Sequence, residues 1–95
     1  MKTNEEDYRG HLMEMLTYEL PVLRARLGIS QSELARRVGI SRQTYNSIEN
    51  GNKKQNWLTF NALIAVFKSY EETEMMLRKI DGFEEELLSV IKTSI

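Results

Sequence analysis

The chain has no cysteine, and among its 95 residues there is only one proline and one histidine. Without cysteine it can form neither a disulfide bond nor a thiolate metal site, and a single histidine makes no histidine cluster. No apolar run approaches the roughly 18 residues that a membrane span needs. The acidic N-terminus lacks an apolar signal region, so we expect a cytoplasmic protein without a membrane partner.

Catalytic machinery is also missing from the sequence. We find no nucleophile paired with a base and no glycine-rich loop for phosphate, so we expect no enzymatic activity and no cofactor. Glu71, Glu72 and Glu74 come closest to a metal site, but their helical spacing and the lack of other ligands argue against one. The sequence therefore directs attention to binding functions.

Strand signals are absent, and the five glycines punctuate amphipathic segments, which predicts an all-α protein of six or seven helices. A hydrophobic content of 41% supports one core, so we expect residues 1–95 to form one domain. Within it we expect a leading helix at residues 1–18, a central unit at 20–67 and a C-terminal helical extension at 69–95.

Several residues predict where helices begin and end. Pro21 predicts a break or kink after Tyr18, followed by a second helix through Leu27. Serine or asparagine precedes four apolar segments, and in two of these cases a glutamate follows at capping-box spacing. The expected caps are Ser30 with Glu33, Ser41, Asn56, and Ser69 with Glu72. We expect the helix after Asn56 to bury Leu58, Leu63, Ile64, Val66 and Phe67.

The stretch QSELARRVGISRQTYNSIEN, residues 31–50, is the most informative part of the chain. It predicts two short helices joined at Gly39, where a positive φ costs glycine little. Ala35 leaves room for the second helix to cross the first. We expect Tyr45 to pack inward with its hydroxyl at the surface. The outward face then carries Arg42, Gln43, Asn46 and Ser47.

These side chains suit the recognition of double-stranded DNA. The major groove admits one α-helix, and arginine and glutamine can pair in bidentate fashion with guanine and adenine. Arg42 and Gln43 stand at the helix start, the part that approaches base edges in such readers. Gln31 and Thr44 are expected to add hydrogen bonds, and Lys53 and Lys54 to add Coulomb attraction to phosphates.

Residues 20–67 resemble the helix-turn-helix family of phage Cro and C1 repressors, also called the XRE family. The matching text is LRARLGISQSELARRVGISRQTYNSIENG. The resemblance implies a lambda-repressor-like bundle with additional N- and C-terminal helices. It implies a phosphate contact for Gln31, a DNA-backbone contact for Thr44, and base contacts for Arg42, Gln43 and Ser47.

The resemblance also implies that Arg24 in the first helix pairs with Glu49 at the end of the third. The sequence offers its own reason. Arg24 lies between apolar Leu23 and Leu27, and Glu49 follows inward-facing Ile48. Because either charge alone would be costly to bury partly, we expect a mutual pair.

Charge is distributed unevenly along the chain, although the net charge is −1. Residues 19–56 carry seven basic and three acidic side chains, whereas both flanks are acidic. We therefore expect a DNA-binding transcriptional regulator, a repressor acting as a homodimer on a palindromic operator. The alternative is a protein-interaction module, such as an antitoxin, whose terminal helices bind a partner protein.

Overall fold

The computed structural model describes the backbone of residues 4–93 and the side chains of residues 7–92. The predicted leading helix and C-terminal extension also include residues 1–3 and 94–95, which lie outside the described residues. In the part described there are six helices and no strand, which confirms the all-α prediction. The helices are α1 (Asn4–Leu27), α2 (Gln31–Val38), α3 (Arg42–Glu49), α4 (Trp57–Lys68), α5 (Glu71–Lys79) and α6 (Phe83–Thr93).

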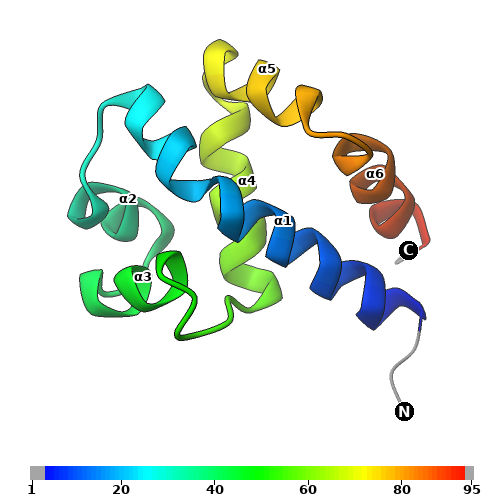
Figure 1. Cartoon of the computed structure of the whole chain (residues 1–95), viewed down its shortest axis with the longest axis horizontal. Helices are drawn as coiled ribbons and strands as arrows, with labels where there is room; N and C mark the ends of the chain where they lie inside the picture. The colour runs from blue at the N-terminus through cyan, green and yellow to red at the C-terminus, as the bar shows by residue number, and fades with distance from the viewer. Residues whose placement is uncertain (1–3, 94–95) are drawn as a thin grey trace.

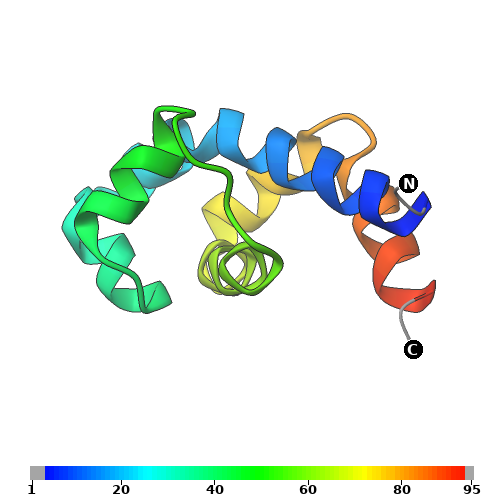
Figure 2. The same cartoon turned by 90° about the horizontal axis from the view of Figure 1, so that it is seen from below.

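Helix α1 is the longest element and joins the two parts of the molecule. It lies across α4, with α2 and α3 to one side and α5 and α6 to the other (Figure 1). Seen from below, α4 is viewed along its axis beneath α1 (Figure 2). This arrangement leaves α3 at one side of the molecule, remote from α6.

Three of the predicted helix caps are present. The side-chain oxygens of Ser30 and Ser41 each accept a backbone N–H three residues on at 3.0 Å, and Asn56 does the same at 2.7 Å. The return half of the Ser30 capping box is absent. Glu33 instead binds Arg36 and Arg37, at 2.6 and 2.8 Å.

The predicted break at Pro21 is wrong, because α1 runs without interruption from Asn4 to Leu27. An internal proline removes one backbone hydrogen bond and crowds the preceding turn. Here its ring lies on the exposed side of the helix, where water can satisfy the carbonyl left without a donor. Leu20 and Leu23 on either side are buried and anchor both halves of the helix in the core.

The predicted Ser69–Glu72 cap is also wrong. Helix α5 follows Tyr70, which makes no side-chain cap. The Ser69 hydroxyl donates backwards to the carbonyl of Val66 at 2.6 Å, and the buried Thr73 hydroxyl donates to the carbonyl of Phe67 at 2.6 Å. Two hydroxyls thus satisfy carbonyls at the end of α4 and fix its turn into α5.

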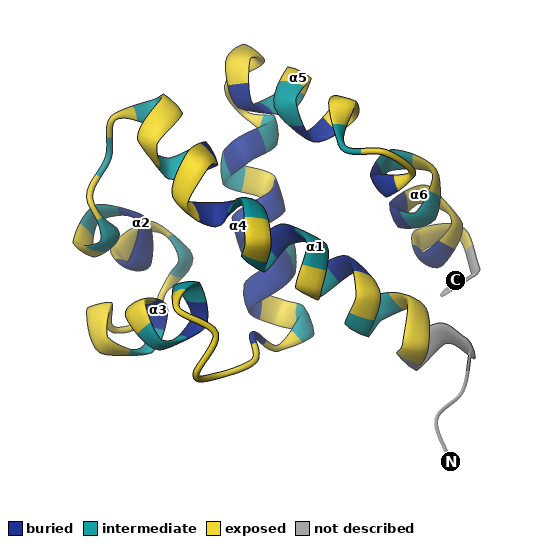
Figure 3. Ribbon diagram, viewed as in Figure 1, coloured by how far each residue is buried: buried dark blue, intermediate teal, exposed yellow. Residues whose placement is uncertain are grey.

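The core gathers one face of α1, the inner faces of α2 to α4, and the apolar faces of α5 and α6 (Figure 3). Leu12 and Leu16 of α1 are fully buried, as is Phe83 of α6. Helices α1 and α6 therefore bury much of their apolar surface against each other. Leu58 is a further correction, since it is 80% exposed. Its neighbour Trp57 turns inward instead and stacks on Phe60 with ring centroids 4.9 Å apart.

Candidate nucleic-acid interface

A short turn joins α2 to α3 and fixes their relative placement. Helix α2 ends at Gly39, whose φ of 79° is left-handed, and the amide of Ile40 donates to the carbonyl of Ala35 at 3.0 Å. Ala35 is 1% exposed, so its methyl group is part of the contact with the core. Ser41 then caps α3, and its hydroxyl also donates to the Thr44 hydroxyl at 2.9 Å. These bonds cap the start of α3 at the surface.

Helix α3 has two distinct faces. Tyr45 and Ile48 are buried, whereas Arg42, Gln43 and Asn46 are exposed and Ser47 is partly exposed. The polar side chains that face solvent therefore begin at the first residue of the helix. The outer surface of α3 offers cationic, amide and hydroxyl groups within two turns.

Glu49 is the centre of a hydrogen-bonded cluster behind this face. Its carboxylate accepts from Arg24 Nε at 3.1 Å and Nη2 at 3.0 Å. It also accepts from the Tyr45 hydroxyl at 2.5 Å and from Gln31 Nε2 at 3.1 Å. Arg24 makes a further bond to the carbonyl of Ile29 at 3.2 Å. One carboxylate thus ties together α1, α2 and α3.

The electrostatics of this cluster follow from its contacts. Burial alone would raise the pKa of Glu49, but hydrogen bonds from Arg24, Tyr45 and Gln31 outweigh it and hold that pKa below its ordinary value. The hydrogen bond to Glu49 raises the pKa of Arg24. Burial, and then donation to Glu49, raise the pKa of Tyr45. The charged pair and the neutral phenol are therefore the stable forms near neutral pH.

Two contacts of the cluster were not expected from the sequence. The Tyr45 hydroxyl was predicted at the surface, yet the residue is fully buried and bonded to Glu49. The i,i+4 spacing of Tyr45 and Glu49 was the available signal for this bond. Asn46 Nδ2 also donates to Gln31 Oε1 at 3.1 Å, which connects the cluster to the outer face of α3.

A family model described as helix-turn-helix matches residues 23–71, which include α2, α3, α4 and the end of α1. The chain belongs to the Cro/C1-type helix-turn-helix family. Its fold is accordingly lambda-repressor-like, and the protein is a DNA-binding transcription regulator. Searches of curated proteins and of solved structures returned no match.

The positive charges around the helix-turn-helix differ in how they are partnered. Arg36 and Arg37 bind Glu33, and Arg24 binds Glu49. Arg42, Lys53 and Lys54 make no ion pair with any described residue, and all three are exposed. The two lysines lie in the loop after α3, where the amide of Lys53 donates to the carbonyl of Ser47 at 3.0 Å.

No group of metal ligands and no membrane-spanning helix is present in the part of the chain that the structure describes. Within residues 7–92 no group of three or more potential metal ligands comes together. None of the helices described is both long and apolar enough to cross a lipid bilayer. His11, far from α3 in the sequence, is an exposed side chain that bonds to Glu86 at 2.7 Å.

Proposed function

We propose that this protein is a transcriptional repressor that places α3 in the major groove and binds a palindromic operator as a homodimer. The observation that carries the proposal is the exposed polar face of α3, tied from behind to α1 and α2 by the hydrogen bonds of the Glu49 cluster. A side chain contacts a base edge favourably when its backbone is already fixed by folding, because less conformational entropy is then lost on binding.

The outward residues have separate proposed roles. Arg42 would contact guanine and Gln43 would contact adenine, since each side chain can form two parallel hydrogen bonds to that base. Asn46 and Ser47, one turn on, would reach base edges further along the groove. Residues proposed to contact phosphates are Gln31, Thr44, Lys53 and Lys54.

We propose a dimer because one recognition helix can distinguish only a short DNA sequence. A single recognition helix contacts few base pairs, whereas two copies related by a two-fold axis read half-sites about one turn, roughly 34 Å, apart. Repression would follow from occupancy, because a bound dimer covers the DNA that a polymerase must enter. The same proposal places the protein with DNA in the cytoplasm.

Selection of bound sites from random double-stranded DNA tests the proposal directly. The expected result is an enriched inverted repeat whose half-sites are spaced by about one helical turn. An enriched single half-site would remove the dimer and keep DNA reading. No enrichment at low salt would reject sequence-specific binding altogether and favour a protein partner. Placing the selected site across a promoter in a transcription assay then tests repression.

A further inference from the structure

Helix α1 has a second apolar stripe that its own core covers only at Met15. The inner stripe, with Leu16 and Leu20, is buried completely. The outer stripe consists of Met15, Tyr18, Val22 and Ala25, at alternating steps of three and four residues. Tyr18 is 83% exposed and Val22 is 56% exposed. Such spacing is the signature of a helix that packs against another helix.

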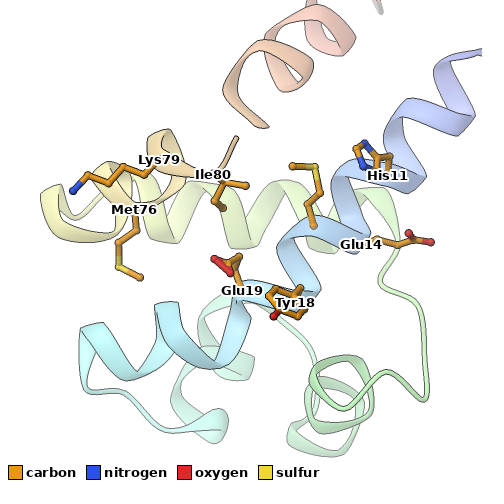
Figure 4. Close-up of a pocket in the computed structure, with 8 residues that line it drawn as sticks. His11, Glu14, Tyr18, Glu19, Met76, Lys79 and Ile80 are labelled. Carbon is orange, nitrogen blue, oxygen red and sulfur yellow. The ribbon is translucent and has the colours of Figure 1, made fainter. Parts of the chain in front are cut away.

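Helix α5 provides the other side of a groove along this stripe. Met75 is 47% exposed, and Met76 and Ile80 are partly exposed beside it. Figure 4 shows Tyr18 and Glu19 on one side of the groove, with Met76, Lys79 and Ile80 on the other. The groove continues past Val22 and Ala25 toward Met75. The two hollows share Met76 and Lys79, so together they follow the outer stripe of α1 along α5.

We propose that the occupant is α1 of a second copy of this chain, packed antiparallel against the outer stripe. The proposal rests on the homodimer put forward above and assigns its interface. Antiparallel pairing about the centre of the stripe sets Tyr18 opposite the second copy's Val22, and Met15 opposite its Ala25. Large side chains then meet smaller ones, as knobs-into-holes packing requires.

Charge along the groove favours this direction. On α1 the acidic Glu14 and Glu19 line the first part of the groove, and Arg26 lines its far end. Antiparallel packing brings Arg26 of each copy to the level of Glu14 of the other, whereas parallel packing would stack like charges. Lys79 lies in the groove with Glu19, so acidic and basic groups share its rim. Both signs are needed when identical surfaces meet.

The geometry also suits a DNA-binding dimer. The two-fold axis between antiparallel helices runs at right angles to both of them. Because α3 lies on one side of α1 and α5 on the other (Figure 1), both copies of α3 would face the same end of that axis. Two recognition helices presented at one end of a two-fold axis are what a palindrome requires.

Sedimentation of the full chain over a range of concentrations tests the interface. Tyr18→Glu and Val22→Glu place a charge in the outer stripe without touching the buried core. We expect each to raise the dimer dissociation constant by about tenfold or more. Leu88→Glu is the matched control, because Leu88 is 45% exposed on α6, outside the groove, and this variant should dimerise normally. Circular dichroism confirms that each variant folds.

Cysteine cross-linking tests whether the two α1 helices run antiparallel. The chain has no cysteine of its own, so only the introduced residues can form disulfides. Tyr18→Cys and Val22→Cys chains, mixed in equal amounts and oxidised, should form mixed disulfide well in excess of the share that random pairing of the two chains gives. Predominant self-linking would indicate a parallel pair and overturn the proposal. A dimer unaffected by both glutamate variants would overturn this interface and leave the proposed function intact. A wild-type chain that is monomeric both free and on its selected DNA would overturn the interface together with the dimer, but not base reading by α3.

Discussion

At the scale of single residues, Glu49 has the most partners in the helix-turn-helix. Glu49→Ala would remove the carboxylate that accepts hydrogen bonds from Arg24, Tyr45 and Gln31. The loss matters most for Tyr45, because this residue is completely buried. Breaking a buried pair by removing one partner costs about 3 kcal/mol or more. We therefore expect the free energy of unfolding to fall by about 3 kcal/mol, measured by urea denaturation.

The control for this variant is Glu74→Ala. Glu74 also accepts from an arginine, Arg78 at 2.7 Å, but that arginine is largely exposed. An exposed i,i+4 pair contributes about 0.3–0.5 kcal/mol, so Glu74→Ala should change the free energy of unfolding only slightly. Equal effects of the two substitutions would show that the Glu49 cluster does not hold the three helices together.

The lowered pKa of Glu49 makes its contribution dependent on pH. Because this pKa lies below its ordinary value of 4.5, the unfolded state binds more protons as pH falls through that window. The stability from Glu49 is thus complete above that value and is lost on acidification. In urea titrations from about pH 7 to about pH 3, the advantage of wild type over Glu49→Gln should shrink. A constant difference would mean that the carboxylate charge is irrelevant.

Arg42 is the residue whose proposed role is most specific. Arg42→Ala should weaken binding to the selected site by about 1–3 kcal/mol and relax preference at one base pair. Competition binding against sites changed at each position measures both effects. Arg78→Ala, an exposed arginine on α5, is the control and should change neither. A uniform loss on all sequences would instead assign Arg42 to a phosphate.

Sequence could predict the Arg24–Glu49 pair, but it misplaced the Tyr45 hydroxyl. Apolar neighbours on both sides make partial burial of Arg24 foreseeable, and a resemblance to a family supplied its partner. The i,i+4 spacing of Tyr45 and Glu49 allowed their hydrogen bond, but the full burial of Tyr45 depends on tertiary packing, which that spacing does not contain. The same holds for the bond between Gln31 and Asn46, which lie 15 residues apart.

At the scale of elements, alanine substitutions at Gly39, in a turn, and at Gly10, inside a helix, should have opposite effects on stability. Gly39→Ala should destabilise the protein by about 1 kcal/mol, because an L-residue is strained at its φ of 79° although nothing crowds a methyl group there. Gly10→Ala should stabilise by about 0.5–1 kcal/mol, since Gly10 lies inside α1 with open space around it. The midpoint temperature of thermal unfolding should therefore fall for Gly39→Ala and rise for Gly10→Ala. The same sign for both would contradict the backbone argument.

Helix ends were predictable where one side chain makes one local bond, and not where packing decides. Ser30, Ser41 and Asn56 cap as their sequences indicate. Pro21 was expected to break or kink the helix; the break is absent, and the leucines around Pro21 are buried in the core. Leu58 was expected inside, yet Trp57 takes the inward direction at the start of α4. Both misses are cases in which tertiary contacts outweigh local preference.

At the scale of the whole molecule, α1 serves both the core and the surfaces that we propose to be functional. Its inner face packs with α4 and α6, and its last turn supplies Arg24 to the Glu49 cluster. Its outer stripe is the proposed dimer interface. A charge introduced at Tyr18 should therefore weaken DNA binding through assembly, whereas Glu49→Ala should weaken it through folding.

The uneven charge of the whole chain gives the last prediction. Although the net charge is −1, Arg42, Lys53 and Lys54 are exposed without ion pairs to described residues, all near α3. The logarithm of the DNA-binding constant should fall linearly with the logarithm of salt concentration, with a slope of about −0.9 for each phosphate neutralised. Lys53→Ala should reduce that slope by about 1 and weaken binding to all sequences alike. Lys92→Ala, on α6 at the opposite side of the molecule (Figure 1), should leave the slope unchanged. Equal changes for both lysines would indicate that overall charge, rather than the basic groups beside α3, governs the attraction to DNA.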